Sequence, residues 1–342
     1  MKNIKIMDCT LRDGGWINDF RFGSENIDLI LSTVEKAGIE YIELGYMDKK
    51  SIPEAGRTFL SSYEELRLLG KKYNNQCNRV VMIDYGKFSV ENLPDYDQNN
   101  NFIDGIRVCF HKKDLEDAII MGKRIVAKGY KLFVQPMVTT RYSDDEFKEL
   151  LDKVKTNIPE FSGVYVVDSF GSMTWDDIYD RLMLCHRELE QGKILGLHLH
   201  NNLNHAFENA QKACSVFKDI QERELIIDGT LMGMGKGAGN VQTEDLADLM
   251  NKECNGEYDT EAIKSIVGKV IAPIRESFVW GCTPEYELSA RYHTTPSYAK
   301  MFSKKNISLE DMEELLANMP DNKRDSFDKE FAKEYLANGI KA

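Results

Sequence analysis

The sequence has no apolar run that approaches the ~20 residues of a membrane-spanning helix, which argues against an integral membrane protein. It has no CxxC pair either, since its seven cysteines are odd in number and scattered, as is usual in a reducing compartment. Basic residues are outnumbered by acidic ones, 44 to 56, so a nucleic acid or an anionic membrane surface is an unfavourable partner. We expect no signal peptide, because the first four residues lead directly into a strand-like run, and we expect a cytoplasmic location.

Short apolar runs do recur along the 342 residues, and each is followed by a turn and an amphipathic stretch. Strands are predicted at residues 4–8, 41–45, 80–85, 105–110, 131–137, 163–168, 194–200 and 225–229. Helices are predicted between them at 26–37, 63–72, 114–128, 144–156, 175–190 and 204–216. This alternation indicates a parallel sheet covered by helices, and eight such units favour a closed (β/α)8 TIM barrel over an open doubly wound sheet.

The alternation stops near residue 257, which divides the chain into a barrel domain at 1–256 and a small C-terminal helical region at 257–342. Helices are predicted there at 261–278 and 308–318, and the charged end at 321–342 favours helix.

Polar side chains stand where the predicted strands end. Barrel enzymes collect catalytic groups at that face, although any single acidic residue could instead cap the next helix. The residues in question are Asp8, Glu43, Asp84, Gln135, Asp168, His198, His200 and Asp228.

His198 and His200 are two residues apart at the end of a strand, so their side chains project from the same face and can share a metal ion. Asn201 and Asn202 follow and could orient the ligands or bind metal-bound water. The alternative is a pair of histidines satisfied by neighbouring carbonyls.

Arg12 and Asp13 follow the first strand in a turn that contains two glycines. A carboxylate beside two imidazoles is a familiar ligand set for Mn²⁺, Mg²⁺, Zn²⁺ or Co²⁺, and an adjacent arginine offers a cation for a developing oxyanion. The alternative is an ion pair that closes the turn. A third segment, at 233–240, alternates glycine with other residues and permits a close backbone approach to a ligand, but its spacing matches neither a Rossmann fingerprint nor a P-loop.

Together the three segments resemble the signature of the DRE-TIM metallolyases, the HMGL-like superfamily. The matching residues are Asp8-x-Thr-Leu-Arg12-Asp13-Gly, His198-x-His200 and Gly237-Ala-Gly-Asn240-x-x-x-Glu244. The 4-hydroxy-2-oxovalerate aldolase-like branch is most similar, because its sixth-strand region resembles residues 166–173. The resemblance covers roughly residues 1–250 and continues weakly to 281–292.

The resemblance implies a metal centre and a substrate site. Asp13, His198 and His200 would ligate a divalent ion, with Mn²⁺ or Mg²⁺ expected first, and Asn240 would ligate or approach it. Arg12 would stabilise an enolate oxygen.

Two further positions follow from the same resemblance. Ser169 would lie near the substrate carboxylate, and Tyr286 would reach into the active site.

Trp16 departs from the family, whose aldolases have a histidine there that deprotonates the substrate hydroxyl. An indole only donates a hydrogen bond, so we expect Trp16 to form a wall of the aldehyde pocket or to pack under its loop. The base would then be Tyr286, Asp19, His293 or a hydroxide on the metal.

The implied reaction is metal-dependent cleavage or formation of the C3–C4 bond of a 4-hydroxy-2-oxo acid, which gives pyruvate and an aldehyde through an enolate. The alternatives are a Claisen-type enzyme of the superfamily that uses an acyl-CoA, and an inactive barrel that acts as a binding protein. The hydroxymethylglutaryl-CoA lyase alternative is weakened because residues 233–240 contain no cysteine. We expect a homodimer and do not assume an aldehyde dehydrogenase partner.

Overall fold

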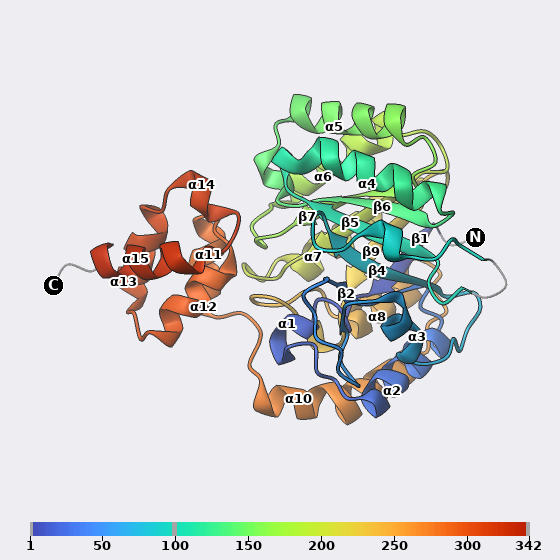
Figure 1. Ribbon diagram of the computed structural model, residues 1–342, viewed down its shortest axis with the longest axis horizontal. Helices are drawn as coiled ribbons and strands as arrows, with labels where there is room; N and C mark the ends of the chain where they lie inside the picture. The colour runs from blue at the N-terminus through green and yellow to red at the C-terminus, as the bar shows by residue number, and fades with distance from the viewer. Residues whose placement is uncertain (1–2, 98–100, 340–342) are drawn as a thin grey trace.

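The protein is described here by a computed structural model that covers residues 3–97 and 101–339. Across these residues, eight parallel strands form a barrel that closes where β1 pairs with both β2 and β9 (Figure 1). The predicted TIM barrel is therefore confirmed, and the open-sheet alternative is wrong. The barrel strands are β1 (Ile4–Asp8), β2 (Tyr41–Met47), β4 (Asn78–Asp84), β5 (Gly105–Phe110), β6 (Lys131–Pro136), β7 (Gly163–Asp168), β8 (Ile194–Leu199) and β9 (Leu225–Gly229).

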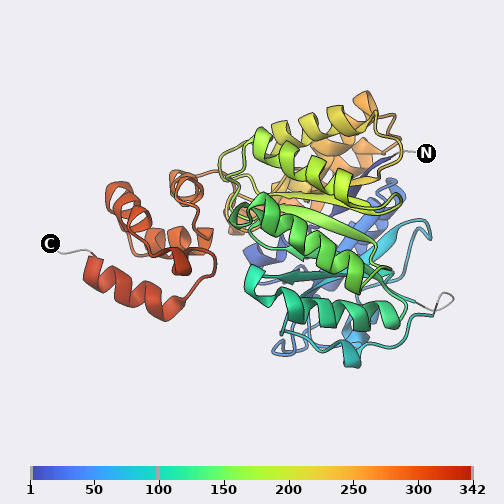
Figure 2. The same cartoon turned by 90° about the horizontal axis from the view of Figure 1, so that it is seen from above.

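Helices cover the outside of the barrel, and all six predicted there are present within a few residues of the expected bounds (Figure 2). The predicted helix at 63–72 is the main difference, since α3 ends at Leu68 and Gly70 then adopts a positive φ of 140°. The helices are α2 (Ser24–Lys36), α3 (Tyr63–Leu68), α4 (Leu115–Ala127), α5 (Asp144–Asn157), α6 (Trp175–Glu188), α7 (Ala206–Phe217) and α8 (Thr243–Glu253). Features that were not predicted include α8, β3 (Phe59–Leu60), which extends the sheet beside β2, and a short 3-10 turn, η1 (Val90–Asn92), in the described part of the β4–β5 connection.

Side chains fill the barrel interior in layers, as is usual for this fold. A buried apolar layer includes Met7, Tyr41, Phe133, Tyr165 and Ile226. Nearer the carboxyl ends of the strands, charged side chains replace apolar ones. The apolar layer therefore fills the interior below the charged side chains.

The C-terminal region divides into two parts. Helix α9 (Thr260–Ile266), a π-helical segment (Val267–Ile271) and α10 (Ala272–Ser277) run on from one another, where the sequence predicts one helix. Their apolar side chains, together with Trp280, join the core of the barrel domain.

The last helices form a second body with its own core, built around Leu288, Tyr298, Phe302, Met312 and Leu316. It stands beside the barrel in both views (Figures 1 and 2). Its helices are α11 (Pro284–Arg291), α12 (Pro296–Lys304), α13 (Leu309–Ala317), α14 (Asp321–Arg324) and α15 (Lys329–Gly339). None of the helices within the described ranges is long and apolar enough to cross a membrane.

Polar contacts join the second body to loops at the carboxyl ends of the barrel strands. Arg141 Nε donates to Asp325 Oδ1 at 2.9 Å, and Ser172 Oγ lies 3.3 Å from His293 Nδ1. The second body therefore covers part of the barrel mouth.

Candidate active site

The loop after β1 is held rigidly by its own sequence. The carbonyl oxygen of Cys9 accepts from the backbone amides of Arg12 and Asp13, at 3.1 and 2.8 Å. Asp8 accepts from the hydroxyl groups of Thr10 and Thr243, which ties the loop to the start of α8. Burial raises the pKa of Asp8 to about 6 in spite of these bonds. Asp8 thus shapes the turn, and the turn directs the two following charged residues inward.

The predicted ligands Asp13, His198 and His200 come together at the barrel mouth. Each is buried, and each offers a ligand atom within 4.8 Å of the others. The imidazole rings stand nearly perpendicular at 86°, with centroids 5.1 Å apart. Burial lowers the pKa of His200 to about 4, so its ring is neutral and free to bind a cation.

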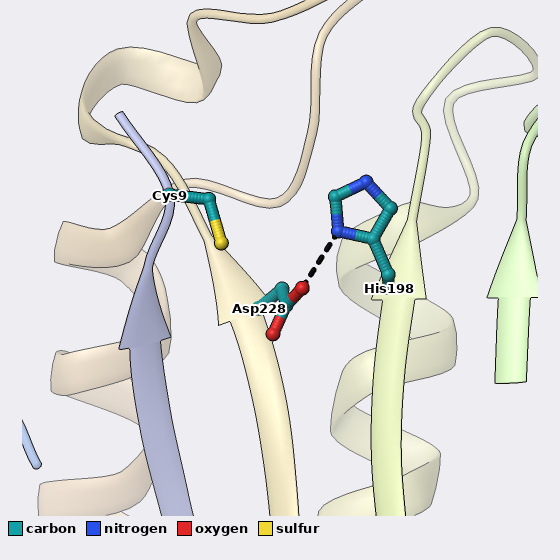
Figure 3. Close-up of side chains that lie close together, drawn as sticks. All are labelled: Cys9, His198 and Asp228. Carbon is teal, nitrogen blue, oxygen red and sulfur yellow. Dashed lines mark hydrogen bonds and ion pairs between the residues drawn. The ribbon is translucent and has the colours of Figure 1, made fainter. Parts of the chain in front are cut away.

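A carboxylate orients the first histidine. His198 Nδ1 lies 2.8 Å from Asp228 Oδ2, which leaves Nε2 as the ligand atom (Figure 3). Burial would raise the pKa of Asp228, but the charge of Arg107 and the bond to His198 outweigh it and hold the pKa low. The aspartate is therefore charged and strengthens the histidine as a ligand.

Unpaired polar atoms show that the residues fit a divalent ion. His200 Nδ1 and Asn240 Oδ1 are buried and have no hydrogen-bond partner among the described residues, which is costly unless a ligand satisfies them. The amide nitrogen of Asn240 donates to Asp13 Oδ2, so Asn240 stands beside the ligand set. A carboxylate with two imidazoles suits Mn²⁺, Zn²⁺ or Co²⁺, and the added amide oxygen suits Mg²⁺ as well.

Cys9 also lies near His198 and Asp228, and these three could form a second ligand set (Figure 3). Burial raises the pKa of the Cys9 thiol well above its usual value, and Arg107 Nη1 lies 3.2 Å from its sulfur. Because the thiol stays protonated and His198 Nδ1 already bonds Asp228, this group is better described as a hydrogen-bonded support for the main site.

Arg12 forms the ion pair with Asp13 that the sequence analysis gave as an alternative. It also bonds a second carboxylate and keeps one donor unpaired among the described residues. Its Nη1 donates to Asp13 Oδ1 at 2.7 Å and its Nε donates to Glu43 Oε2 at 2.6 Å. Its Nη2 is buried and has no partner within the described part of the chain. The guanidinium is thus fixed by two carboxylates and keeps one donor for a substrate.

Beneath the site, Arg107 holds two carboxylates of the barrel interior. Its side chain is fully buried, pairs with Glu43 at 2.8 Å and with Asp228, and stacks 4.5 Å from the ring of Tyr165. The sequence analysis does not identify Arg107, although a charged residue inside a buried apolar strand is a signal for such a role.

Replacing Arg107 with leucine should destabilise the fold by about 3–5 kcal/mol, because Asp228 would be left buried without an arginine beside it and Glu43 would keep Arg12 as its one arginine partner. Urea unfolding measures this loss. Arg21→Leu removes an exposed arginine that also pairs with two carboxylates and serves as the control. Equal unfolding midpoints for the two variants would contradict a structural role for the Arg107 network.

A cavity of about 140 Å³ opens above these residues. The residues singled out from the sequence that line it are Arg12, Asp13, Trp16, Asp84, Gln135, Ser169, His198 and His200. Tyr46 and Lys236 line it as well, and the second body contributes Thr295 and Asp325.

The suggested bases Asp19, Tyr286 and His293 do not line this cavity. Asp19 is exposed, and its carboxylate accepts from Arg57 at 3.0 Å. Tyr286, on α11, packs against the core of the second body. In the observed position of the second body, Thr295 lines the cavity and Tyr286 does not.

Lys236 is a cavity residue that the sequence analysis passes over, although it stands between glycines in the loop at 233–240. Burial lowers its pKa, and within the described ranges its ammonium group has no hydrogen-bond or ion-pair partner. The preceding Gly235 lets the loop cross the site, because a Cβ there would lie 2.6 Å from Asp13 Oδ2 and 2.4 Å from Asn240 Nδ2.

The chain is similar to known proteins of one family. The HMGL-like family model matches residues 111–270. The chain is 27% identical over 257 residues to a 4-hydroxy-2-oxovalerate aldolase of Geobacillus genomosp. 3, covering 73% of this chain and 71% of that protein. It is 25% identical over 248 residues to an oxaloacetate decarboxylase of Mycobacterium tuberculosis, covering 72% and 70%.

Solved structures agree on the fold. The N-terminal domain of a candidate aldolase from Bacteroides vulgatus is 25% identical and superposes with a TM-score of 0.72, covering 88% of this chain and 96% of that one. The carboxyl transferase domain of Rhizobium etli pyruvate carboxylase is 12% identical with a TM-score of 0.72, covering 94% and 57%. The similarity to the carboxyl transferase domain concerns the fold alone, because the two sequences are only 12% identical.

Proposed function

We propose that this chain is a metal-dependent carbon–carbon lyase that cleaves and forms the C3–C4 bond of 4-hydroxy-2-oxo acids, which gives pyruvate and an aldehyde. One observation carries the proposal: Asp13, His198 and His200 converge in the cavity that also holds Arg12. Mn²⁺ or Mg²⁺ is the metal we expect, with Zn²⁺ or Co²⁺ as alternatives.

A divalent ion bound there would supply a Lewis acid for the keto group of the 2-oxo acid. Asp13, His198 and His200 would hold it, and Asn240, whose Oδ1 has no hydrogen-bond partner among the described residues, could add a further ligand. Arg12 then places its free Nη2 donor where negative charge grows on the enolate oxygen.

Two groups are suited to anionic parts of the substrate. Lys236 offers an unpaired ammonium group in the cavity. Ser169 also lines the cavity, and its hydroxyl accepts from the backbone amide of Val138 at 2.9 Å, which leaves its proton free for a substrate carboxylate.

A screen of substrates tests the proposal. Pyruvate release should be observed with a panel of 4-hydroxy-2-oxo acids in the presence of Mn²⁺ or Mg²⁺. If pyruvate is consumed only when acetyl-CoA is present, the Claisen-type alternative replaces the proposal. If the purified protein binds no metal and does not enolise pyruvate, it is a binding protein instead.

Decarboxylation of oxaloacetate is a second candidate function. The cavity contains two cationic side chains, Arg12 and Lys236, which suits a substrate with two carboxylates. One relative carries the name oxaloacetate decarboxylase. Loss of CO₂ from C3 leaves the same enolate as aldol cleavage, and it requires no proton to be taken from a hydroxyl group. Release of CO₂ from oxaloacetate faster than the metal-catalysed background in solution would support it.

Trp16 should set which aldehydes are accepted. It lines the cavity and packs edge-on against Tyr46, with ring centroids 5.7 Å apart. Trp16→His should therefore keep activity but change the ratio of kcat/KM between small and large aldehydes, measured in the direction of synthesis. Trp175, which lies at the start of α6 away from the cavity, gives the matched control Trp175→His. An unchanged ratio with lowered stability would mean that Trp16 only packs under its loop.

A further inference from the structure

The aldol reaction needs a group that takes a proton from the C4 hydroxyl, and Trp16 stands where related aldolases have a histidine. Carboxylates are the acceptors to consider, and Asp13, Asp84 and Asp325 line the cavity. Asp13 belongs to the ligand set, and Asp325 pairs with Arg141 at 2.9 Å. Among the described residues, Asp84 forms no ion pair with a lysine or arginine side chain, so its charge is not neutralised directly.

Neighbouring rings fix the position of Asp84. It is the last residue of β4, and it accepts a hydrogen bond from the hydroxyl of Tyr46 on β2. The ring of Tyr46 is held in turn between Phe59, stacked at 5.3 Å, and Trp16. Trp16 therefore packs against Tyr46. Tyr46 in turn bonds Asp84 and fixes its position in the cavity.

From this arrangement we propose that Asp84 is the proton-transfer group of the reaction. This inference rests on the proposed function. In the cleavage direction, the Asp84 carboxylate takes the C4 hydroxyl proton, and the C4–O bond becomes a carbonyl. The electron pair of the C3–C4 bond moves to the C2–C3 enolate, and the aldehyde leaves. Asp84 then returns the proton to C3, which completes pyruvate and restores the carboxylate.

The electrostatic surroundings suit that task. Burial raises the pKa of Asp84, which makes it a stronger base than an exposed aspartate, whereas Tyr46, Arg12, Lys87 and Lys236 act in the opposite direction. Cys109 and His111 also face it, from the end of β5 and the loop after it. Since the carboxylate form is the active base, kcat/KM for cleavage should rise with pH through the pKa of Asp84.

The experiment compares aldol cleavage with decarboxylation of oxaloacetate, because only cleavage takes a hydroxyl proton. Asp84→Asn keeps the size of the side chain and removes the base. It should lower cleavage about 10²–10⁴-fold, abolish the rising limb of the pH profile, and leave CO₂ release and metal content little changed. An equal fall in both reactions, or no fall in cleavage, would overturn the proposal.

Two further variants separate proton transfer from positioning. Tyr46→Phe removes a donor to the carboxylate, so the rising limb should move to higher pH and remain visible. Asp325→Asn changes the other cavity carboxylate outside the ligand set, and the limb should stay where it is in the wild type. If Asp325→Asn removes the limb and Asp84→Asn does not, Asp325 is the base.

Exchange of the pyruvate methyl protons with deuterium, followed by NMR, separates this inference from the proposed function. Wild-type protein should catalyse the exchange without any aldehyde, and Asp84→Asn should lose it. Exchange that depends on Asp84, in a protein that cleaves no 4-hydroxy-2-oxo acid, supports the role of Asp84 and refutes the proposed substrate. Absence of exchange in the wild type overturns both.

Discussion

His198→Ala protein should fold normally, lose its bound divalent metal and lose aldol cleavage together. The reason is geometric, because His198 offers one of three ligand atoms that lie within 4.8 Å of one another at the barrel mouth. Loss of a group that only orients a ligand lowers metal affinity or activity about 10–100-fold, so loss of the ligand itself should exceed that range. Metal content by mass spectrometry, circular dichroism and pyruvate release measure the three effects.

Two further variants test whether metal loss is specific to His198. Asp228→Asn keeps the ligands but weakens the orienting bond to His198, so its metal affinity should lie between those of wild type and His198→Ala. His205→Ala removes an exposed histidine just before α7 and should retain the metal. Full activity of wild-type protein after dialysis against a chelator, with no metal left, would refute the metal centre.

Arg12→Lys should lower kcat for cleavage about 10²–10³-fold while changing substrate affinity much less. The positive charge is kept, but a lysine cannot bond Asp13 and Glu43 at 2.7 and 2.6 Å and still offer a third donor in the same plane. The free Nη2 is the atom that we expect to meet the enolate oxygen, so the loss should fall on the chemical step.

Arg21→Lys, on an exposed side chain after the same loop, is the matched control and should keep a normal kcat. Steady-state kinetics separates kcat from KM, and metal analysis excludes an indirect effect through Asp13. If Arg12→Lys keeps its metal and a nearly normal kcat, Arg12 is a structural partner of Asp13 and Glu43 only.

The barrel could be predicted from sequence because each strand carries its own local signal. A run such as Gly105–Phe110 is buried along its whole length, and its apolar residues show this without knowledge of its neighbours. The two-residue β3 has no such signal, since it exists only through pairing with the end of β2. No helix is predicted in the β4–β5 connection, and its described part has only the 3-10 turn η1.

The side chains that we propose as metal ligands could be found from sequence because they lie on motifs of fixed local geometry, and the structure brings them together. The proton-transfer group could not, since its identity depends on how separate elements meet. The resemblance directs attention to Tyr286, but the docking of the second body presents Thr295 to the cavity. From sequence, Asp84 is one of several polar residues at strand ends and Lys236 is not singled out; the structure distinguishes them because the end of β4 and the loop at 233–240 line one cavity.

The last helices have a hydrophobic core separate from that of the barrel, yet Thr295 and Asp325 reach the cavity from them. In the proposed reaction the metal ligands all lie on the barrel, whereas the walls of the cavity come from both bodies. Substitutions of Thr295 or Asp325 are expected to change acceptor range while leaving the proposed ligands in place, because those ligands all lie on the barrel. In such an architecture, new substrates can evolve by exchange or drift of the second body while the metal chemistry is inherited intact.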